Sequence, residues 1–280
     1  MTPRSWLYVP GHRADRVAKA LAAGADAVVV DLEDAVPPDQ KETARATALR
    51  LASQGPHERP LWVRVNDPTG PWGEDDIDAL AGLELTGLRV PRCEDPAVIR
   101  DVATRAGLPL QLLLESAAGL ARAAELATAH PLVAGLGLGE ADLSADLRVT
   151  GDDGLAWARG WVVVAARAAG LPSPVQSVYT DVADLDGLRA STERARANGF
   201  VGRSVVHPRQ IPVVHEVFTP TAAEVAAARA VLAAAARAQE AGEVAVLDAD
   251  GRFVDPAVVR RARLVHDLTE PSDPPSGGTS

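Results

Sequence analysis

An alternation of short apolar runs with amphipathic segments, repeated eight times along the chain, constrains the fold most. The apolar runs have the length of buried strands, and the segments between them have the periodicity of helices. Such alternation is typical of a parallel sheet in which a helix connects each strand to the next. The predicted strands are Ser5–Val9, Ala27–Leu32, Leu61–Val65, Gly87–Val90, Gln111–Leu114, Leu132–Leu138, Val175–Gln176 and Val201–Val206.

The predicted helices fill the intervals between these strands and follow the last one. Gly24, Gly107, Gly170 and Gly199 come just past helix ends, where a left-handed residue is common. Eight such units fit a closed barrel better than an open sheet, and 280 residues is the usual size for one barrel. The sequence therefore predicts a (β/α)8 TIM barrel over residues 1–220. Its helices are expected at Asp15–Ala23, Lys41–Ala52, Asp75–Ala81, Pro96–Ala106, Ala118–Thr128, Leu155–Ala169, Leu185–Asn198 and Pro208–Val217.

A C-terminal extension is expected over residues 221–269, as helix, hairpin and helix. The first helix is Ala-rich, and Asp250-Gly251 is a typical hairpin turn. Residues 270–280 are rich in Pro, Ser and Gly, which predicts a disordered tail. We interpret the extension as a lid or oligomerisation element. Its predicted parts are Ala222–Ala241, Glu243–Val254 and Pro256–Asp267.

Composition limits the function classes. The net charge of −10 argues against non-specific nucleic-acid binding, whereas a basic cluster near the N-terminus (Arg4, Arg13, Arg16 and Lys19) leaves room for an anionic small ligand. Cys93 is the only cysteine, so no intrachain disulfide is possible. We find no run of eighteen apolar residues and no secretion signal, which favours a cytoplasmic protein without a membrane span.

Acidic residues follow several of the predicted strands, at the end of a barrel where active residues lie. Glu115 and Asp142 follow consecutive strands, so their carboxylates should be neighbours. Such a pair suits Mg²⁺, which keeps coordination sites for water and substrate, whereas zinc would prefer His or Cys ligands. The alternative interpretation is a solvated loop acid beside a helix N-cap. A further acidic group, Asp31, Glu33 and Asp34, follows the second strand without an assigned role.

Other chemistries are less favoured by the sequence. A Schiff-base lysine is needed at a strand end, but Lys19 and Lys41 both lie in predicted helices. Gly135–Gly139 resembles a dinucleotide-binding loop only loosely, because acids follow it. Cys93 is interpreted as a packed residue, and His207 as a residue that stabilises the barrel rim rather than a catalytic one.

Seven sequence blocks, in order along nearly the whole chain, resemble the HpcH/HpaI aldolase and citrate lyase β-subunit family. They include Arg4-Ser5-Trp6-Leu7-Tyr8-Val9-Pro10-Gly11, Asp31-Leu32-Glu33-Asp34-Ala35-Val36, Val63-Arg64-Val65-Asn66, Glu115-Ser116-Ala117-Ala118-Gly119, Gly139-Glu140-Ala141-Asp142, Val206-His207-Pro208 and Gly251-Arg252-Phe253-Val254-Asp255. Two departures are visible: Arg92 stands where many members carry Lys, and Pro256 follows Asp255 directly.

The resemblance implies a trimeric or hexameric, Mg²⁺-dependent lyase. It would cleave a 3-hydroxyacyl thioester such as citryl-CoA or malyl-CoA into acetyl-CoA and a 2-keto acid, oxaloacetate or glyoxylate. Glu115 and Asp142 would hold Mg²⁺, Arg64 would bind the keto-acid oxygens, and Gly139, Glu140 and Ala141 would offer backbone N–H groups. Two alternatives stay open: a subunit that acts only on acyl-carrier protein in a citrate lyase complex, and a CoA-independent pyruvate aldolase.

Two further site hypotheses concern residues away from the acidic pair. Asp255 is expected to act as the acid–base group of a neighbouring subunit, or else only to cap the helix that follows it. Arg16 and Lys19 are expected to bind the nucleotide end of the CoA thioester, or else to form a solvated helix face.

Overall fold

The computed structural model describes residues 2–240, 246–247 and 253–268, and it divides into two compact units. The first unit is Thr2–Phe218, and the second begins at Thr219, two residues before the start expected for the extension. The two units are described separately below. The predicted Asp250-Gly251 turn and the predicted tail at 270–280 lie outside the described residues.

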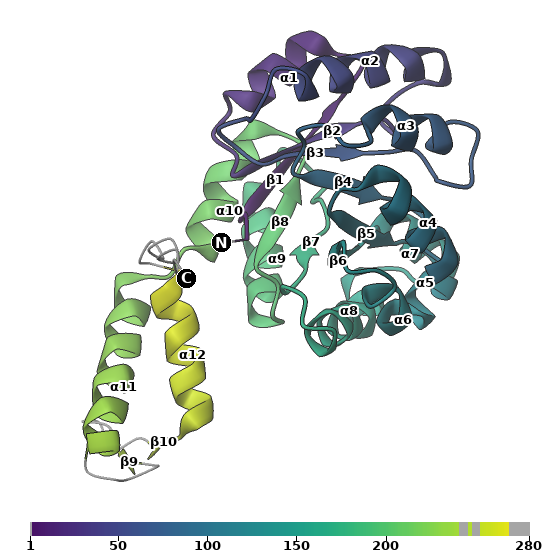
Figure 1. The fold of residues 1–280 in the computed structure, drawn as a ribbon. Helices are drawn as coiled ribbons and strands as arrows, with labels where there is room; N and C mark the ends of the chain where they lie inside the picture. Colours follow the sequence, from purple (N-terminus) through teal and green to yellow (C-terminus); the bar gives the residue numbers. More distant parts are fainter. Residues whose placement is uncertain (1, 241–245, 248–252, 269–280) are drawn as a thin grey trace, which may run out of the picture. The chain divides into compact units, whose positions relative to one another are not determined.

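The first unit is a closed barrel of eight parallel strands (Figure 1), which confirms the predicted fold. The strands pair in sequence order, and β8 pairs with β1 to close the ring, Ser5 lying opposite Arg203. The strand β7 has only two residues and meets β6 through one pair, Gly137 and Val175. The strands are β1 Ser5–Pro10, β2 Ala27–Asp31, β3 Leu61–Arg64, β4 Gly87–Val90, β5 Leu110–Leu114, β6 Val133–Leu138, β7 Val175–Gln176 and β8 Gly202–Val205.

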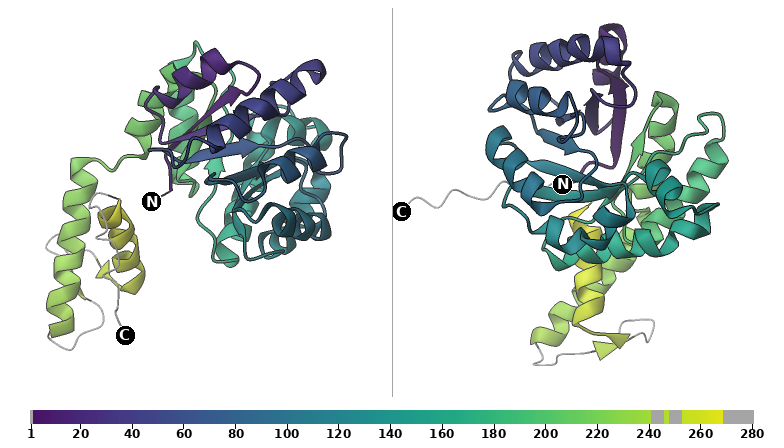
Figure 2. Two further views of the ribbon diagram at one scale, coloured as in Figure 1. Left: turned by 45° about the horizontal axis from the view of Figure 1, so that its top comes forward. Right: turned by 90° about the vertical axis from the view of Figure 1, so that its right-hand side faces the viewer.

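Helices surround the ring of strands on its outer side (Figures 1 and 2). Large apolar side chains between strands and helices form the main core, as the helical periodicity predicts. The α-helices are α1 Ala14–Leu21, α2 Lys41–Ala52, α3 Gly73–Leu80, α4 Pro96–Ala106, α5 Ala117–Ala121, α6 Ala123–Ala127, α7 Glu140–Leu147, α8 Ala156–Ala168, α9 Leu185–Ala197 and α10 Ile211–Phe218; the 3-10 turns are η1 Pro38–Gln40, η2 Asp152–Leu155 and η3 Pro208–Gln210.

The structure corrects two helix predictions. The single helix expected at Ala118–Thr128 is two short helices, because Arg122 between them leaves helical geometry at φ −100° and ψ 14°. The helix α7 was not predicted, since its acidic first turn resembles a loop of functional residues. The four glycines expected past helix ends all have positive φ, as predicted.

A second, smaller apolar cluster fills the interior of the barrel at the N-terminal half of its strands. It contains Trp6, Ala27, Val29, Trp62 and Val175, and the two tryptophan rings pack at a centroid distance of 5.2 Å. Because this end is filled by large side chains, the polar side chains that point inward occupy the opposite, C-terminal end of the barrel.

The second unit consists of α11 Ala222–Glu240, β9 Val246–Leu247, β10 Phe253–Val254 and α12 Pro256–Asp267. The two strands form an antiparallel pair, and α11 packs against α12 (Figure 2). This is the predicted order of helix, hairpin and helix.

One stretch of the described residues, Pro208–Glu240, is long and apolar enough to cross a membrane, with a mean hydropathy of 1.3 over its best window. A single stretch of this kind is weak evidence, because core helices pass the same test. Here the stretch contains η3, α10 and α11, and its chain leaves helical geometry at 219–221, between the two units. The expectation of no membrane span stays a prediction.

Candidate active site

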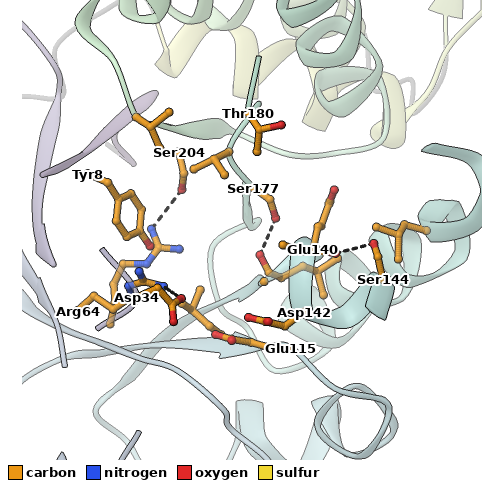
Figure 3. A pocket seen from close by; sticks show the side chains of 18 of the residues that line it. Tyr8, Asp34, Arg64, Glu115, Glu140, Asp142, Ser144, Ser177, Thr180 and Ser204 are labelled. Atoms are coloured by element: carbon orange, nitrogen blue, oxygen red, sulfur yellow. Dashed lines mark hydrogen bonds and ion pairs between the residues drawn. The ribbon is translucent and has the colours of Figure 1, made fainter. Parts of the chain in front are cut away.

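A cavity of about 760 Å³ opens at the C-terminal ends of the barrel strands (Figure 3). Six of the predicted site residues line it, and they come from β3, from the end of β5 and from the start of α7. These six are Arg64, Glu115, Gly139, Glu140, Ala141 and Asp142.

Three predicted site residues do not line this cavity. Arg16 and Lys19 are exposed on α1, and Asp255 belongs to the second unit. The carboxylate of Asp255 accepts hydrogen bonds from the backbone N–H groups of Ala257 and Val258, at 2.8 and 2.9 Å. Asp255 therefore caps α12, as the alternative interpretation expects, while its catalytic role stays a prediction.

Glu115 and Asp142 lie side by side at the cavity (Figure 3), close enough to share a hydrogen bond. Glu115 is only 5% exposed, and its Oε1 has no hydrogen-bond partner. Burial, together with the neighbouring carboxylate of Asp142, raises the pKa of Glu115 to about 7. Two carboxylates in contact and a buried oxygen without a partner form an arrangement that a bound cation would stabilise.

The donor set fits Mg²⁺. Within the described residues there is no group of three or more His, Cys, Asp or Glu side chains that could hold a metal ion. Mg²⁺ needs no such group, since one or two carboxylates suffice when water and substrate oxygens complete its shell. Gly139 also leaves room for the site, because a Cβ there would lie 2.7 Å from Glu115 Cγ.

Arg64 is held by an acidic cluster after β2. Its Nε and Nη2 each lie 2.7 Å from the carboxylate of Asp31, and its Nη1 lies 2.8 Å from Glu33 and 3.1 Å from Asp34. Glu33 therefore forms a salt bridge with Arg64, whereas Asp67 accepts hydrogen bonds from the backbone N–H and the hydroxyl of Thr69, both at 2.8 Å. Burial raises the pKa of Glu33 to about 8. The cluster fixes the guanidinium at the cavity wall.

Glu140 is tied to the opposite wall. Its carboxylate lies 2.7 Å from Arg159 Nη2 and accepts from Gln176 Nε2 at 2.8 Å. The N–H of Gly139 donates to the carbonyl of Leu114, at 3.1 Å. Pairing at the end of β6 thus already uses the first of the three backbone N–H groups expected at the site, and a role for all three stays a prediction.

Three glycines lie in or just after β6, at every second position. Gly135, Gly137 and Gly139 alternate with leucine, and each faces a long side chain from a neighbouring part of the barrel. A Cβ at position 135 would lie 2.6 Å from Gln111. At position 137 it would lie 3.3 Å from Leu113 and 3.4 Å from the Arg89 guanidinium, and at position 139 it would lie 2.7 Å from Glu115. The glycine-rich segment thus makes space inside the barrel for these side chains.

Sequence reasoning missed several residues that line the cavity, among them Tyr8, Arg89, Arg159 and Ser177. The period-2 pattern of β4 could have found Arg89, because it follows Gly87 by two residues and shares its inward face. Arg159 gave no such signal, since it lies within α8 and reaches the cavity from the side.

Lys41 is buried and holds the segment after β2. Its Nζ donates to the carbonyls of Leu32 and Glu33, both at 2.8 Å, and to Asn66 Oδ1 at 2.6 Å. It does not line the cavity.

Cys93 and His207 have structural roles, as expected. Cys93 is buried, and burial raises the pKa of its thiol well above the usual value. His207 Nδ1 accepts from the N–H of Arg209 at 3.1 Å and forms a capping box with Gln210 at the barrel rim. Arg92, the departure noted after β4, is exposed and has a left-handed backbone at φ 49°.

These features define a TIM-barrel enzyme with two adjacent carboxylates, Glu115 and Asp142, and a fixed arginine at the same cavity. Residues 4–208 match the family described as HpcH/HpaI aldolase/citrate lyase. The chain is 39% identical to a citrate lyase subunit beta-like protein of Deinococcus radiodurans, covering 94% of this chain and 95% of that one. It is 37% identical to a (3S)-malyl-CoA thioesterase of Cereibacter sphaeroides, over 77% of each chain. The chain belongs to the HpcH/HpaI aldolase/citrate lyase family.

Solved structures agree with this assignment. CitE of Mycobacterium tuberculosis, in complex with magnesium, acetoacetate and coenzyme A, has a TM-score of 0.80 and 32% identity, over 95% of this chain and 97% of that chain. The citrate lyase beta subunit complexed with oxaloacetate and magnesium, from the same organism, has a TM-score of 0.69 and 33% identity, over 78% and 97%. The predicted family, barrel and carbon–carbon lyase class are confirmed, and magnesium in both structures agrees with the predicted cofactor.

Proposed function

We propose that this protein is a Mg²⁺-dependent lyase that cleaves a 3-hydroxyacyl thioester, such as citryl-CoA or malyl-CoA, into acetyl-CoA and a 2-keto acid. The observation that carries the proposal is the contact between Glu115 and Asp142, with a buried Glu115 oxygen that has no partner. A relative named L-malyl-CoA/beta-methylmalyl-CoA lyase, 32% identical over 94% of this chain, supports the substrate class.

In this proposal, Glu115 and Asp142 hold Mg²⁺ at the mouth of the barrel. When bound, the ion supplies a Lewis acid that stabilises negative charge on the oxygen that becomes the ketone. Burial of Glu115 keeps water away from one side of the pair. The N-terminus of α7, beginning at Glu140, directs further N–H groups toward the same cavity.

Arg64 orients the keto acid. Its guanidinium is held by Asp31 through two hydrogen bonds of 2.7 Å, which fix the plane of the fork before substrate arrives. A planar fork recognises a carboxylate through two parallel hydrogen bonds, so it sets the direction in which the scissile bond points. Pairing with Asp31 and binding of substrate are compatible, because a guanidinium has five N–H donors.

Three finer elements of the function are part of the same proposal. We place the nucleotide end of CoA near Arg16 and Lys19, and we assign Asp255 to the proton transfer in a neighbouring subunit of a cytoplasmic homotrimer or homohexamer. The second unit would then act as a lid as well as an oligomerisation element. Its helix cap at Asp255 is compatible with this role when the lid alternates between states.

A second candidate function is hydrolysis of the thioester. It is favoured by the relatives named (3S)-malyl-CoA thioesterase, at 37% identity. A thioesterase releases free CoA and a hydroxy acid, whereas a lyase releases acetyl-CoA and a keto acid. A substrate carried on acyl-carrier protein and a CoA-independent aldolase reaction also stay open, and the products formed from each substrate distinguish them.

The test is a screen of the purified protein with Mg²⁺ against citryl-, malyl-, β-methylmalyl- and hydroxymethylglutaryl-CoA. We expect a keto acid and an acyl-CoA product from at least one thioester, without release of free thiol. Turnover of any one of them excludes a subunit that acts only on acyl-carrier protein. Release of free thiol at the rate of substrate loss would contradict the lyase and support the thioesterase.

Two substitutions test the metal assignment. Glu115→Gln and Asp142→Asn should each weaken Mg²⁺ binding, measured by calorimetry, and abolish cleavage without unfolding the barrel. Glu193→Gln, at an exposed position on α9, is the matched control and should leave both properties unchanged. Retention of the original Mg²⁺ affinity by either site variant would show that the ion is held elsewhere.

A further inference from the structure

Arg89 is a buried cation without an acidic partner at the active-site cavity. It is 3% exposed, lies on β4 and lines the cavity together with Arg64 and Glu115. Its guanidinium lies 5.1 Å from the ring centre of Trp6 and 5.4 Å from that of Tyr8. Its polar contacts are few: Nη1 lies 3.5 Å from Ser204 Oγ, at the limit of a hydrogen bond, and Nε has no partner.

The other two arginines that line the cavity are both neutralised by carboxylates. Arg64 is paired with the acidic cluster after β2, and Arg159 is paired with Glu140 and Asp152, at 2.7 and 2.8 Å. Among the described residues, no carboxylate forms an ion pair with the Arg89 guanidinium. A buried cation is costly unless it is paired, and aromatic faces offset only part of that cost.

Arg203 shows how this barrel accommodates a buried arginine with a structural role. It is also nearly inaccessible, at 2% exposed, but it does not line the cavity. Its Nη atoms donate to Thr192 and Ser191 on α9, at 2.9 and 3.0 Å. Arg89 has no comparable set of short hydrogen bonds, and it lies where a substrate would supply them.

The space around Arg89 is kept open by β6. Gly137 faces it, and a Cβ at that position would lie 3.4 Å from Arg89 Nη2. The ring centre of Tyr8 lies 5.4 Å from the Arg89 guanidinium and 5.3 Å from the Arg64 guanidinium, and all three side chains line the same cavity. A small acid with two anionic groups can therefore reach both.

From this geometry we infer that Arg89 binds a second carboxylate of the substrate, so that the 2-keto acid released by this enzyme is a dicarboxylic acid. The inference rests on the proposed lyase function and narrows it: the first carboxylate lies at the Mg²⁺ and Arg64 end, and the distal one lies against Arg89. A keto acid with a single carboxylate would leave Arg89 without a partner.

The test compares two acids that differ by one carboxylate. Binding of oxaloacetate and of pyruvate to the Mg²⁺-loaded protein is measured by calorimetry for the wild type, Arg89→Met and Arg89→Lys. Arg203→Met is the control, because it also removes a buried arginine but lies outside the cavity. Thermal unfolding of each variant shows whether the barrel is intact.

We expect the wild type to prefer oxaloacetate and Arg89→Met to lose that preference by about ten- to a hundredfold, the effect of one charge-assisted hydrogen bond. Affinity for pyruvate should stay unchanged, Arg89→Lys should recover part of the preference, and Arg203→Met should keep it. Equal affinity of the wild type for both acids, or an equal loss for both acids in Arg89→Met, would overturn the inference.

The outcome is separable from that of the proposed function. If the protein binds both acids equally but cleaves a thioester, the lyase function is supported and the role of Arg89 is contradicted. If the wild type cleaves none of the thioesters but Arg89→Met loses the preference for oxaloacetate, the carboxylate site is supported and the lyase function is contradicted. If Arg89→Met does not fold, a crystal structure of the wild type with Mg²⁺ and oxaloacetate decides, by whether the distal carboxylate contacts the Arg89 guanidinium.

Discussion

Gly139 lies directly against the side chain of Glu115. A Cβ at position 139 would come within 2.7 Å of Glu115 Cγ and 2.8 Å of its Cδ. The backbone of Gly139, with φ −91° and ψ 82°, needs no glycine for its own conformation. The glycine is therefore required for space, and it links the end of β6 to the position of the Glu115 carboxylate.

Substitution of Gly139 by alanine should move Glu115 and weaken Mg²⁺ binding. We expect the Mg²⁺ dissociation constant to rise by about tenfold or more, equivalent to about 1.4 kcal/mol, while the barrel stays folded. Gly160→Ala is the control, because a Cβ at that position on α8 meets nothing within 4 Å. If Gly139→Ala binds Mg²⁺ as the wild type does, then Glu115 is not held in place by the glycine or is not a ligand.

Arg64→Lys should lower affinity for the keto acid. A lysine keeps the charge but loses the planar fork that Asp31 holds, so we expect a loss of about tenfold or more in calorimetric titrations with oxaloacetate. Arg105→Lys is the control and should leave this affinity unchanged, because Arg105 on α4 also makes a forked contact with a carboxylate, that of Asp78 at 3.0 and 2.8 Å, but does not line the cavity. Unchanged affinity in Arg64→Lys would favour a purely structural salt bridge.

Asp255 can be tested by mixing two inactive proteins, Asp255→Ala and Glu115→Gln. If each active site combines residues of two subunits, mixed oligomers should recover part of the activity. Subunit exchange is checked independently by mass spectrometry. Activity of Asp255→Ala alone, with no gain on mixing, would mean that Asp255 serves only as the cap of α12.

Arg16 and Lys19 are predicted to attract the CoA thioester. Reversing both charges should raise KM for the thioester several-fold, because the attraction is removed. It should also weaken the dependence of KM on salt concentration, because the attraction that salt screens is no longer present. Reversal of Arg50 and Arg100, which are exposed on α2 and α4, is the charge-matched control. Equal effects in both double variants would indicate a general effect of net charge.

Asp26 should make the stability of the barrel pH-dependent. Burial alone would raise the pKa of Asp26, but hydrogen bonds from the Arg4 side chain and backbone outweigh it and hold the pKa below its usual range. Because the pKa of Asp26 is lower in the folded protein than in the unfolded chain, the ionised carboxylate stabilises the fold. This stabilisation is fully present above the unfolded pKa of about 3.9 and is lost as the pH falls through the folded pKa.

The measurement is denaturant unfolding of the wild type and Asp26→Asn from pH 7 to pH 3. We expect the variant to be less stable by about 1 kcal/mol at pH 7, with the gap closing below about pH 4. Asp39→Asn, at an exposed position, should show no gap at any pH. A gap for Asp26→Asn that stays constant down to pH 3 would contradict the assigned contact.

Local patterns in the sequence were sufficient for the barrel and for the acidic pair. Strand and helix periodicities act over a few residues, so the predicted bounds of β4 and β7 match the structure, and the other strands differ by a single residue at one end or both. Glu115 and Asp142 could be paired in advance, because parallel strands in sequence order place their C-terminal ends together. The cap at Asp255 is equally local, since Pro256 follows it at the first helical position.

Only the tertiary structure decided which charged groups are neutralised. Arg64 pairs with Asp31, and Glu140 pairs with Arg159, whereas Arg89 has no such carboxylate partner among the described residues. Each of these outcomes depends on residues that are not neighbours in the sequence. The register between β2 and β3 places Asp31 opposite Arg64, whereas the surroundings of Arg89 depend on side chains of several strands meeting inside one ring, with the glycines of β6 leaving them room. Periodicity shows which face a side chain takes, but the partner it meets there depends on closure and register across the whole barrel.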